Sequence, residues 1–219
     1  SILLMILLSG IKKRYIIISA LSGVVGMVFL VISEPYRLKR IFAFINPWED
    51  PLGAGFQSIQ SLYAIGPGGL LGMGLFNSVQ KHFYLPEPQT DFIFSIIAEE
   101  FGVVGAFIVI GLFSIILIRG IKIATTTKDA FSKYLSFGIL FQLMFQTIMN
   151  LMVVIGMIPV TGVTLPFLSY GGSSLMISMI SIGIILTPAS LALAMTISPP
   201  ITKVSFSPSA STKEVKPSI

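Results

Sequence analysis

Four long apolar runs dominate this sequence and limit what the chain can fold into. They cover residues 15–33, 101–118, 134–158 and 174–194. Each is close to the roughly 20 residues that an α-helix needs to cross the hydrocarbon core of a bilayer. We therefore expect an all-α protein, a polytopic bundle of transmembrane helices.

The shortage of charged residues supports this interpretation. Of the 219 residues, 54% are hydrophobic and 11% are charged, whereas a soluble domain usually carries about 25% charged residues. The chain has no cysteine and a single histidine, His82, which excludes disulfides, thiolate catalysis and zinc sites built from Cys or His clusters. A bound metal would need oxygen ligands, as Mg²⁺ does.

Lysine and arginine residues predict the orientation in the membrane. They lie in short clusters before the first apolar run, between the second and third, and in the C-terminal tail, whereas residues 159–173 carry no charge. The positive-inside rule then puts the tail in the cytoplasm and residues 34–90 and 159–173 outside. Since the basic clusters flank apolar runs, the net charge of +5 predicts a multi-pass cell-membrane protein and no nucleic-acid partner.

The predicted organisation is one transmembrane domain over residues 1–198, followed by a disordered cytoplasmic tail over 199–219. Residues 2–8 are too short to span a membrane, and we expect them to be the end of a truncated helix. The large extracytoplasmic loop, residues 34–90, is expected to contain short helices. Within it, Phe56, Ile59, Leu62 and Tyr63 recur at helical spacing, with polar residues between them, which predicts a short amphipathic or re-entrant helix.

Asp91 lies in the segment richest in chemically capable residues. Pro86 and Pro88 stiffen the approach to it, and Asp91 falls where a helix is expected to begin. One interpretation is a helix N-cap, which aspartate favours. The other is a carboxylate at the outer membrane face that acts as a general base or a magnesium ligand. The two interpretations are compatible.

Two further polar groups have alternative interpretations. Arg37, Lys39 and Arg40 follow the first apolar run and predict either a collar facing lipid headgroups or a cationic site for a diphosphate. Lys81 and His82 are similar candidates. The residues at 142, 146 and 150 are Gln, Gln and Asn, a polar stripe that either joins helices or lines a cavity.

Four segments resemble the SEDS family, which includes FtsW, SpoVE and RodA, and they occur in the family's order. They are residues 46–61 (NPWEDPLGAGFQSIQS), 85–102 (LPEPQTDFIFSIIAEEFG), 150–162 (NLMVVIGMIPVTG) and 166–175 (PFLSYGGSSL). The sequence NSVQK at 77–81 favours the FtsW/SpoVE branch. The resemblance covers nearly the whole chain except the tail and corresponds to the C-terminal part of the family.

This resemblance implies a peptidoglycan glycosyltransferase that polymerises lipid II into glycan strands during cell division or sporulation. Asp91 matches the family's essential carboxylate, which as general base would deprotonate the acceptor sugar while undecaprenyl diphosphate leaves, with inversion. Arg37, Arg40 and Lys81 are the candidates for binding the diphosphate, together with a divalent cation, Mg²⁺ or Mn²⁺, for which Asp91 is the candidate ligand. Further substrate-binding candidates are Glu87, Ser169 and Tyr170.

The resemblance also implies partners, namely a class B penicillin-binding protein transpeptidase, other divisome proteins and membrane lipids. Two other functions stay open. A lipid II flippase or transporter would carry paired ionisable residues near the bilayer midplane, which these apolar runs lack. A non-catalytic division scaffold that recruits a transpeptidase predicts that Asp91→Asn is harmless.

Overall fold

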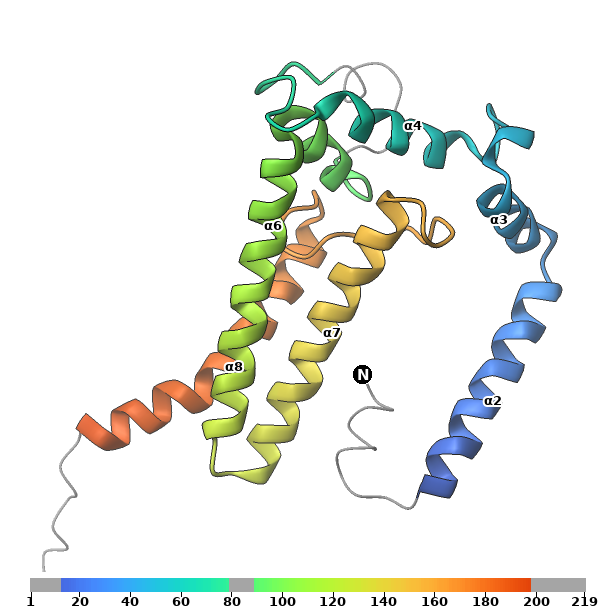
Figure 1. Cartoon of the computed structure of the whole chain (residues 1–219). Coiled ribbons are helices and arrows are strands. Elements are labelled where there is room, and N and C mark those ends of the chain that lie inside the picture. Colours follow the sequence, from blue (N-terminus) through green and yellow to red (C-terminus); the bar gives the residue numbers. More distant parts are fainter. Residues whose placement is uncertain (1–12, 79–88, 198–219) are drawn as a thin grey trace, which may run out of the picture.

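The structure, a computed structural model, describes residues 13–78 and 89–197. Figure 1 shows the elements, and no strand occurs within these two ranges, so the predicted all-α fold is confirmed for them. The helices are α2 (Lys13–Ile32), α3 (Pro35–Ile45), α4 (Phe56–Ile65), α6 (Ile93–Thr126), α7 (Ala130–Val154) and α8 (Gly172–Ile197), with single turns η1 (Pro47–Glu49) and η2 (Gly66–Gly68).

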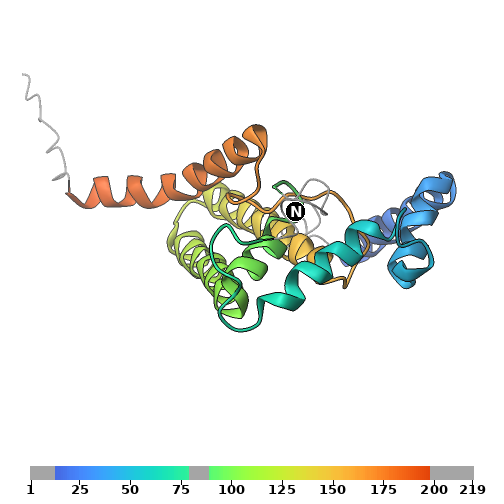
Figure 2. The ribbon, with the colours of Figure 1, turned by 90° about the horizontal axis from the view of Figure 1, so that it is seen from above.

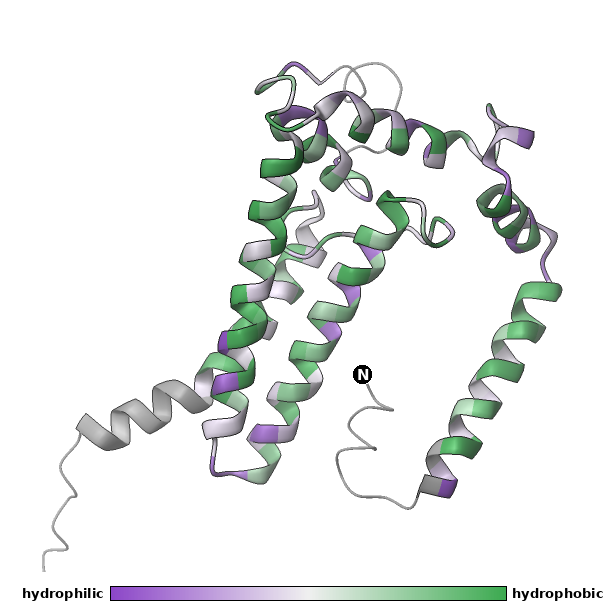
Figure 3. Ribbon diagram, viewed as in Figure 1, coloured by the Kyte–Doolittle hydropathy of each residue, from purple (hydrophilic) through white to green (hydrophobic). Residues whose placement is uncertain are grey.

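Several of these helices are long and apolar enough to cross a membrane. By length and composition α6 and α7 each qualify, and α2 with α3 forms a third candidate that bends by 97° between the two helices. Residues Gly172–Thr187 of α8 form a shorter apolar helix. Figure 3 shows hydrophobic colouring along most of α2 and α6. The chain is therefore a multi-pass membrane protein.

The helices begin and end near, but not at, the limits of the apolar runs. Helix α6 extends well beyond its run at both ends, whereas α7 ends at Val154 although the apolar run continues to residue 158. Gly156 has a φ of +73°, a left-handed conformation that ends helices and favours glycine. The residues after it form an irregular connection, residues 155–171, which we call the α7–α8 loop.

A hydrophobic core joins both ends of α6 to α7, α8 and the α7–α8 loop. Among its buried members are Phe92 and Phe94 near the start of α6, Leu143 in α7, Leu165 in the loop and Ile185 in α8. Viewed from above, α4 crosses over the bundle toward α3, while α2 and α3 lie to one side (Figure 2). We call the end of the bundle that carries α3 and α4 the loop end.

Helix α6 is broken at Gly102, which divides it into a short helix, 93–101, and a long one, 103–126. Gly102 has φ 64° and ψ −157°, a backbone conformation open only to glycine. The segment 69–74 fills the break. Met73 and Gly74 donate backbone N–H groups to residues 99 and 100, at 2.9 and 3.0 Å, and Val103 donates to the carbonyl of Gly69 at 3.0 Å. The sequence analysis expects a helix to begin near Asp91 and an apolar run over 101–118, and neither feature predicts this break.

The predicted short helix in the large loop is confirmed as α4, but its buried face differs from the expected one. Ser61, which the apolar spacing puts on the polar side, is fully buried, and its hydroxyl donates to the carbonyl oxygen of Val154 at 2.8 Å. Leu62 and Tyr63 are exposed. The buried residues of α4 are Ile59, Ser61 and Ala64, so the face that packs on the bundle keeps Ile59 of the predicted apolar set and otherwise consists of small residues.

Candidate functional site

Asp91 lies just before the short helix 93–101 and is half-buried. The helix begins at Ile93 with Phe92 as its N-cap residue, and no side chain caps it. The interpretation of Asp91 as an N-cap is therefore wrong. Asp91 lies one residue before the N-cap position.

Asn150, near the end of α7, holds the backbone beside Asp91 in position. Its side-chain Nδ2 donates to the carbonyl oxygen of Asp91 at 2.7 Å and to that of Val163 at 2.7 Å. Asn150 is 1% exposed, so these two hydrogen bonds are screened from solvent. One side chain thus ties the Asp91 segment to the α7–α8 loop.

The α7–α8 loop passes directly in front of the Asp91 carboxylate. Gly162 has a φ of +71°, and a Cβ atom built on it would lie 3.5 Å from Asp91 Oδ2. Further along, the Tyr170 N–H donates to the carbonyl oxygen of Gln89 at 2.7 Å. The loop therefore approaches the Asp91 segment at two points, and Gly162 brings its backbone close to the carboxylate.

The polar stripe on α7 joins this helix mainly to the loop. Gln146 Nε2 donates to the carbonyl oxygen of Thr164 at 2.9 Å, and the hydroxyls of Thr164 and Ser174 are hydrogen-bonded at 2.9 Å. Gln142, at the start of the stripe, is exposed. The joining interpretation is correct for Gln146 and Asn150, although their partner is an irregular segment rather than a helix.

The two predicted arginines lie in different surroundings on α3. Arg40 is half-buried, and its Nη1 donates to the carbonyl oxygen of Val160 in the α7–α8 loop at 2.9 Å. Its guanidinium also lies over the ring of Tyr36, 4.7 Å from the ring centre. Arg37 is exposed and donates to the carbonyl oxygen of Leu30 in α2 at 2.6 Å. Only Arg40 therefore reaches the loop that contacts Asp91.

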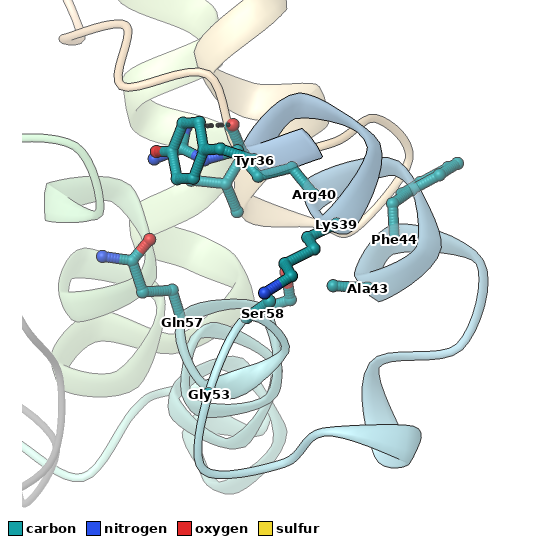
Figure 4. A pocket seen from close by; sticks show the side chains of 10 residues that line it. Tyr36, Lys39, Arg40, Ala43, Phe44, Gly53, Gln57 and Ser58 are labelled. Atoms are coloured by element: carbon teal, nitrogen blue, oxygen red, sulfur yellow. Dashed lines mark hydrogen bonds between the residues drawn. The ribbon is translucent and has the colours of Figure 1, made fainter. Parts of the chain in front are cut away.

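A pocket of about 270 Å³ lies between α3 and α4, with Val160 as its contribution from the α7–α8 loop. We call it the α3–α4 pocket. Lys39 and Arg40 line it together with Gln57 and Ser58, and Figure 4 shows the Lys39 side chain pointing across it toward Ser58. Within the part of the chain that the structure describes, no Asp or Glu is among the lining residues. The pocket is cationic and has hydrogen-bonding groups on its walls.

Of the remaining predicted residues, Ser169 and Tyr170 lie in the α7–α8 loop. Ser169 is 6% exposed, and its Oγ accepts the backbone N–H of Leu165 at 2.7 Å, so it holds the loop's own conformation. Tyr170 is 76% exposed. Lys81 and Glu87 lie outside the described residues.

Two glutamates at the end of the short helix are buried. Glu99 is 1% exposed and accepts a hydrogen bond from the Ser78 hydroxyl at 2.5 Å. Glu100 is 7% exposed, and its Oε1 has no hydrogen-bond partner among the described residues. Burial follows from the break at Gly102, because segment 69–74 covers this end of the helix.

The site therefore combines an anchored carboxylate with a nearby cationic pocket. Within residues 13–78 and 89–197 no group of three or more His, Cys, Asp or Glu residues could hold a metal ion. A single carboxylate such as that of Asp91 still fits the pattern in which Mg²⁺ is bound by one or two carboxylates and by the phosphates of a substrate.

Sequence reasoning missed Gly162 and the anchoring role of Asn150. The available signal for Gly162 was its place in a long uncharged connection, where a glycine indicates an unusual backbone conformation or a close approach. The partner of Asn150 is 59 residues away in sequence, so spacing along α7 could not identify it.

Comparisons with known proteins agree with this description. The sequence profile of the FtsW/RodA/SpoVE family, described as "Cell cycle protein", matches residues 1–191. The chain is 53% identical over 184 residues to stage V sporulation protein E of Bacillus subtilis (strain 168), covering 84% of this chain and 50% of that protein. It is 45% identical over 184 residues to the probable peptidoglycan glycosyltransferase FtsW of Geobacter sp. (strain M18), covering 84% and 50%.

A solved structure is also similar, one described as "Structural coordination of polymerization and crosslinking by a peptidoglycan synthase complex". The TM-score is 0.65 at 32% sequence identity, and the match covers 85% of this chain and 52% of the chain in that structure. The present chain thus spans about half the length of the curated relatives that it matches.

Proposed function

This chain belongs to the FtsW/RodA/SpoVE family, and we propose that the full-length protein is a peptidoglycan glycosyltransferase that polymerises lipid II. The observation that carries the proposal is the position of Asp91. Its backbone is anchored by Asn150, and its carboxylate lies beside Gly162 of the α7–α8 loop. The Geobacter relative is named as a probable peptidoglycan glycosyltransferase, which supports the same reaction.

In this proposal Asp91 is the general base. Its carboxylate takes the proton from the 4-hydroxyl of the acceptor sugar, the resulting oxygen attacks the anomeric carbon of the donor, and undecaprenyl diphosphate leaves with both bonding electrons. One displacement inverts the configuration, so a single base is sufficient and no covalent enzyme intermediate is needed. The anchoring by Asn150 supports this role because a base must be held within hydrogen-bonding reach of the proton.

Cationic groups are needed to stabilise the leaving diphosphate. Of the candidates Arg37, Arg40 and Lys81, Arg40 has the strongest support because its guanidinium is fixed on Val160, two residues from Gly162. A divalent cation, Mg²⁺ or Mn²⁺, held by Asp91 and the diphosphate would neutralise charge on the phosphate oxygens. Glu87, Ser169 and Tyr170 remain proposed contacts of the substrate.

The proposal includes orientation and partners. The loop end lies on the extracytoplasmic side of the cell membrane and the C-terminal tail lies in the cytoplasm. This is the orientation that the distribution of lysines and arginines predicts. A class B penicillin-binding protein is the proposed transpeptidase partner, together with other divisome proteins. The similarity to a chain of a peptidoglycan synthase complex supports such a partner.

The test uses the full-length protein, purified with its transpeptidase and supplied with labelled lipid II. Asp91→Asn is expected to reduce the polymerisation rate by at least about 100-fold, the usual contribution of a general base. Asp129→Asn is the control, because Asp129 caps α7 far from Asp91 in sequence and asparagine caps equally well.

The other outcomes identify the competing functions. Glycan strands of undiminished length from Asp91→Asn would remove the base assignment. Transfer of lipid II across vesicle membranes without polymer would favour a transporter. Recruitment of the transpeptidase by a wild-type protein that makes no polymer would favour a scaffold.

A further inference from the structure

The α3–α4 pocket has the composition of an anion site. Lys39 and Arg40 contribute two positive charges to its lining, and none of the described residues that line it is a carboxylate. Lys39 makes no hydrogen bond or ion pair with any described residue, and its side chain points across the pocket toward Ser58 (Figure 4). A cation without a carboxylate partner, beside hydroxyl and amide groups, is arranged to bind an external anion.

Arg40 is already held in place before any ligand binds. One N–H donates to Val160 and the face of the guanidinium covers Tyr36. Arginine has five N–H donors, so most of them are left for a ligand. A guanidinium fixed in this way loses little conformational freedom on binding, which favours affinity, and its planar geometry suits the oxygen atoms of a phosphate.

The position of the pocket indicates the kind of anion. Helix α3 turns by 97° from α2, so it runs across the loop end instead of along the bundle. It is amphipathic, because Phe42 and Ile45 are exposed apolar residues on the helix that also carries the three basic residues. Such a helix lies in the membrane interface, which is the depth of lipid phosphate groups.

The volume of the pocket agrees with a headgroup and not with a larger ligand. At about 270 Å³ it falls just below the range of roughly 300–1,000 Å³ that is usual for drug-sized ligands. The apolar side chains of Ala43 and Phe44 also line it, and they are suited to contact the first carbons of a lipid chain.

We propose that the α3–α4 pocket binds the phosphate group of an anionic lipid, with Lys39 and Arg40 as the charged contacts and Ser58 and Gln57 as hydrogen-bonding contacts. The lipid is the diphosphate-linked substrate or a bulk anionic phospholipid, and choosing the first rests on the proposed function. Because Arg40 is hydrogen-bonded to the carbonyl oxygen of Val160, a lipid phosphate bound in the pocket also restrains the α7–α8 loop that contacts Asp91.

The test measures binding of two probes to the full-length protein in phosphatidylcholine nanodiscs. The probes are undecaprenyl diphosphate and phosphatidylglycerol, and the dissociation constant is measured for wild type, Lys39→Gln and Ser58→Ala. Lys39→Gln is expected to weaken binding about tenfold, as for the loss of one charge-assisted hydrogen bond, and Ser58→Ala about threefold. Lys122→Gln, an exposed cation on α6 outside the pocket lining, is the matched control.

The result also identifies the lipid. Weaker binding of the diphosphate alone would identify the substrate, and weaker binding of phosphatidylglycerol alone a bulk phospholipid. Unchanged dissociation constants for both probes, in a Lys39→Gln protein with the wild-type melting temperature, would overturn the proposal. The outcome is independent of the base assignment, because the dissociation constants are measured without polymerisation and are compared among variants that all keep Asp91.

Discussion

At the scale of single residues, a few side chains with distant partners build the site. The buried side chain of Asn150 donates two hydrogen bonds, one to the backbone carbonyl oxygen of Asp91 and one to that of Val163. Arg40 connects α3 to the same loop at Val160. Each contact joins segments far apart in sequence, and each satisfies a backbone carbonyl that would otherwise lose its hydrogen bond on burial.

We expect Asn150 to be a positioning residue, so that Asn150→Ala lowers kcat for polymerisation with little change in KM. The two carbonyls lose their donor, at a cost of about 1–3 kcal/mol for each that stays buried and unsatisfied. Asn150→Asp should not rescue activity, because a carboxylate of the same shape cannot donate. Gln142→Ala, an exposed position on the same stripe, is expected to behave like wild type in both kinetics and melting temperature.

Asp129 predicts a pH dependence of stability. Its carboxylate accepts the backbone N–H of Ser132 at 2.7 Å at the start of α7, and this hydrogen bond lowers the pKa of Asp129. A carboxyl whose pKa is lower in the folded state stabilises the fold above its unfolded pKa, about 3.9, and loses that effect as the pH falls through the folded pKa.

Wild type is therefore expected to melt at a higher temperature than Asp129→Ala at pH 7, and the difference should shrink at pH 3. Thermal unfolding in detergent at both pH values measures it. An equal difference at the two pH values would mean that the ionised carboxylate is not the stabilising group.

At the scale of elements, the break in α6 determines where the Asp91 segment lies. The short helix 93–101 could not leave the axis of the long helix without Gly102, whose φ is 64°. The segment 69–74 supplies the hydrogen bonds that an uninterrupted helix would have made. Glycines on both sides allow the two backbones to approach closely, since a Cβ on Gly72 would lie 2.1 Å from the carbonyl oxygen of Glu100.

Gly102→Ala is expected to destabilise the protein by more than about 1–2 kcal/mol, the cost of a left-handed conformation for a residue with a side chain. A Cβ there would also lie 2.5 Å from the backbone nitrogen of Gly72. Gly111→Ala, in the same helix with no atom within 4 Å of its Cβ position, should be neutral or stabilising by up to about 1 kcal/mol. Melting temperatures in detergent compare the two, and equal effects would contradict the role given to the break.

At the scale of the whole molecule, the loop end collects the site, and the opposite end carries the connection between α6 and α7. Helix α2 exposes apolar side chains along its length, including Met27 and Phe29. This exposure is expected where lipid or further protein covers the helix, and the chain spans about half the length of its relatives.

The proposed orientation can be tested by labelling, because this stretch contains no cysteine. Leu52→Cys at the loop end, where Leu52 is 88% exposed, should react with an impermeant maleimide added outside intact cells. Ala130→Cys, exposed at the start of α7, should react only after permeabilisation. The reverse pattern would put Asp91 on the cytoplasmic side and contradict the proposed reaction.

Much of the fold followed from local pattern, and much of the site did not. The apolar runs predicted the helices, and helical spacing predicted α4, because both depend on residues close together in sequence. The face of α4 was assigned wrongly at Ser61, whose partner Val154 is 93 residues away. Of the seven predicted site residues, Asp91 and Arg40 contact the α7–α8 loop region, whereas the separation of Arg37 became visible only in three dimensions.

The amino-acid sequence alone determined that this chain is helical and crosses a membrane, because too few charges are present to cover a water-facing surface. Its motifs also predicted the family and indicated Asp91 as the candidate general base. Tertiary structure decided the break in α6, the burial of Glu99 and Glu100, and the path of the α7–α8 loop past Asp91. These depend on hydrogen bonds and close glycine contacts between distant segments, which no periodicity along the chain records.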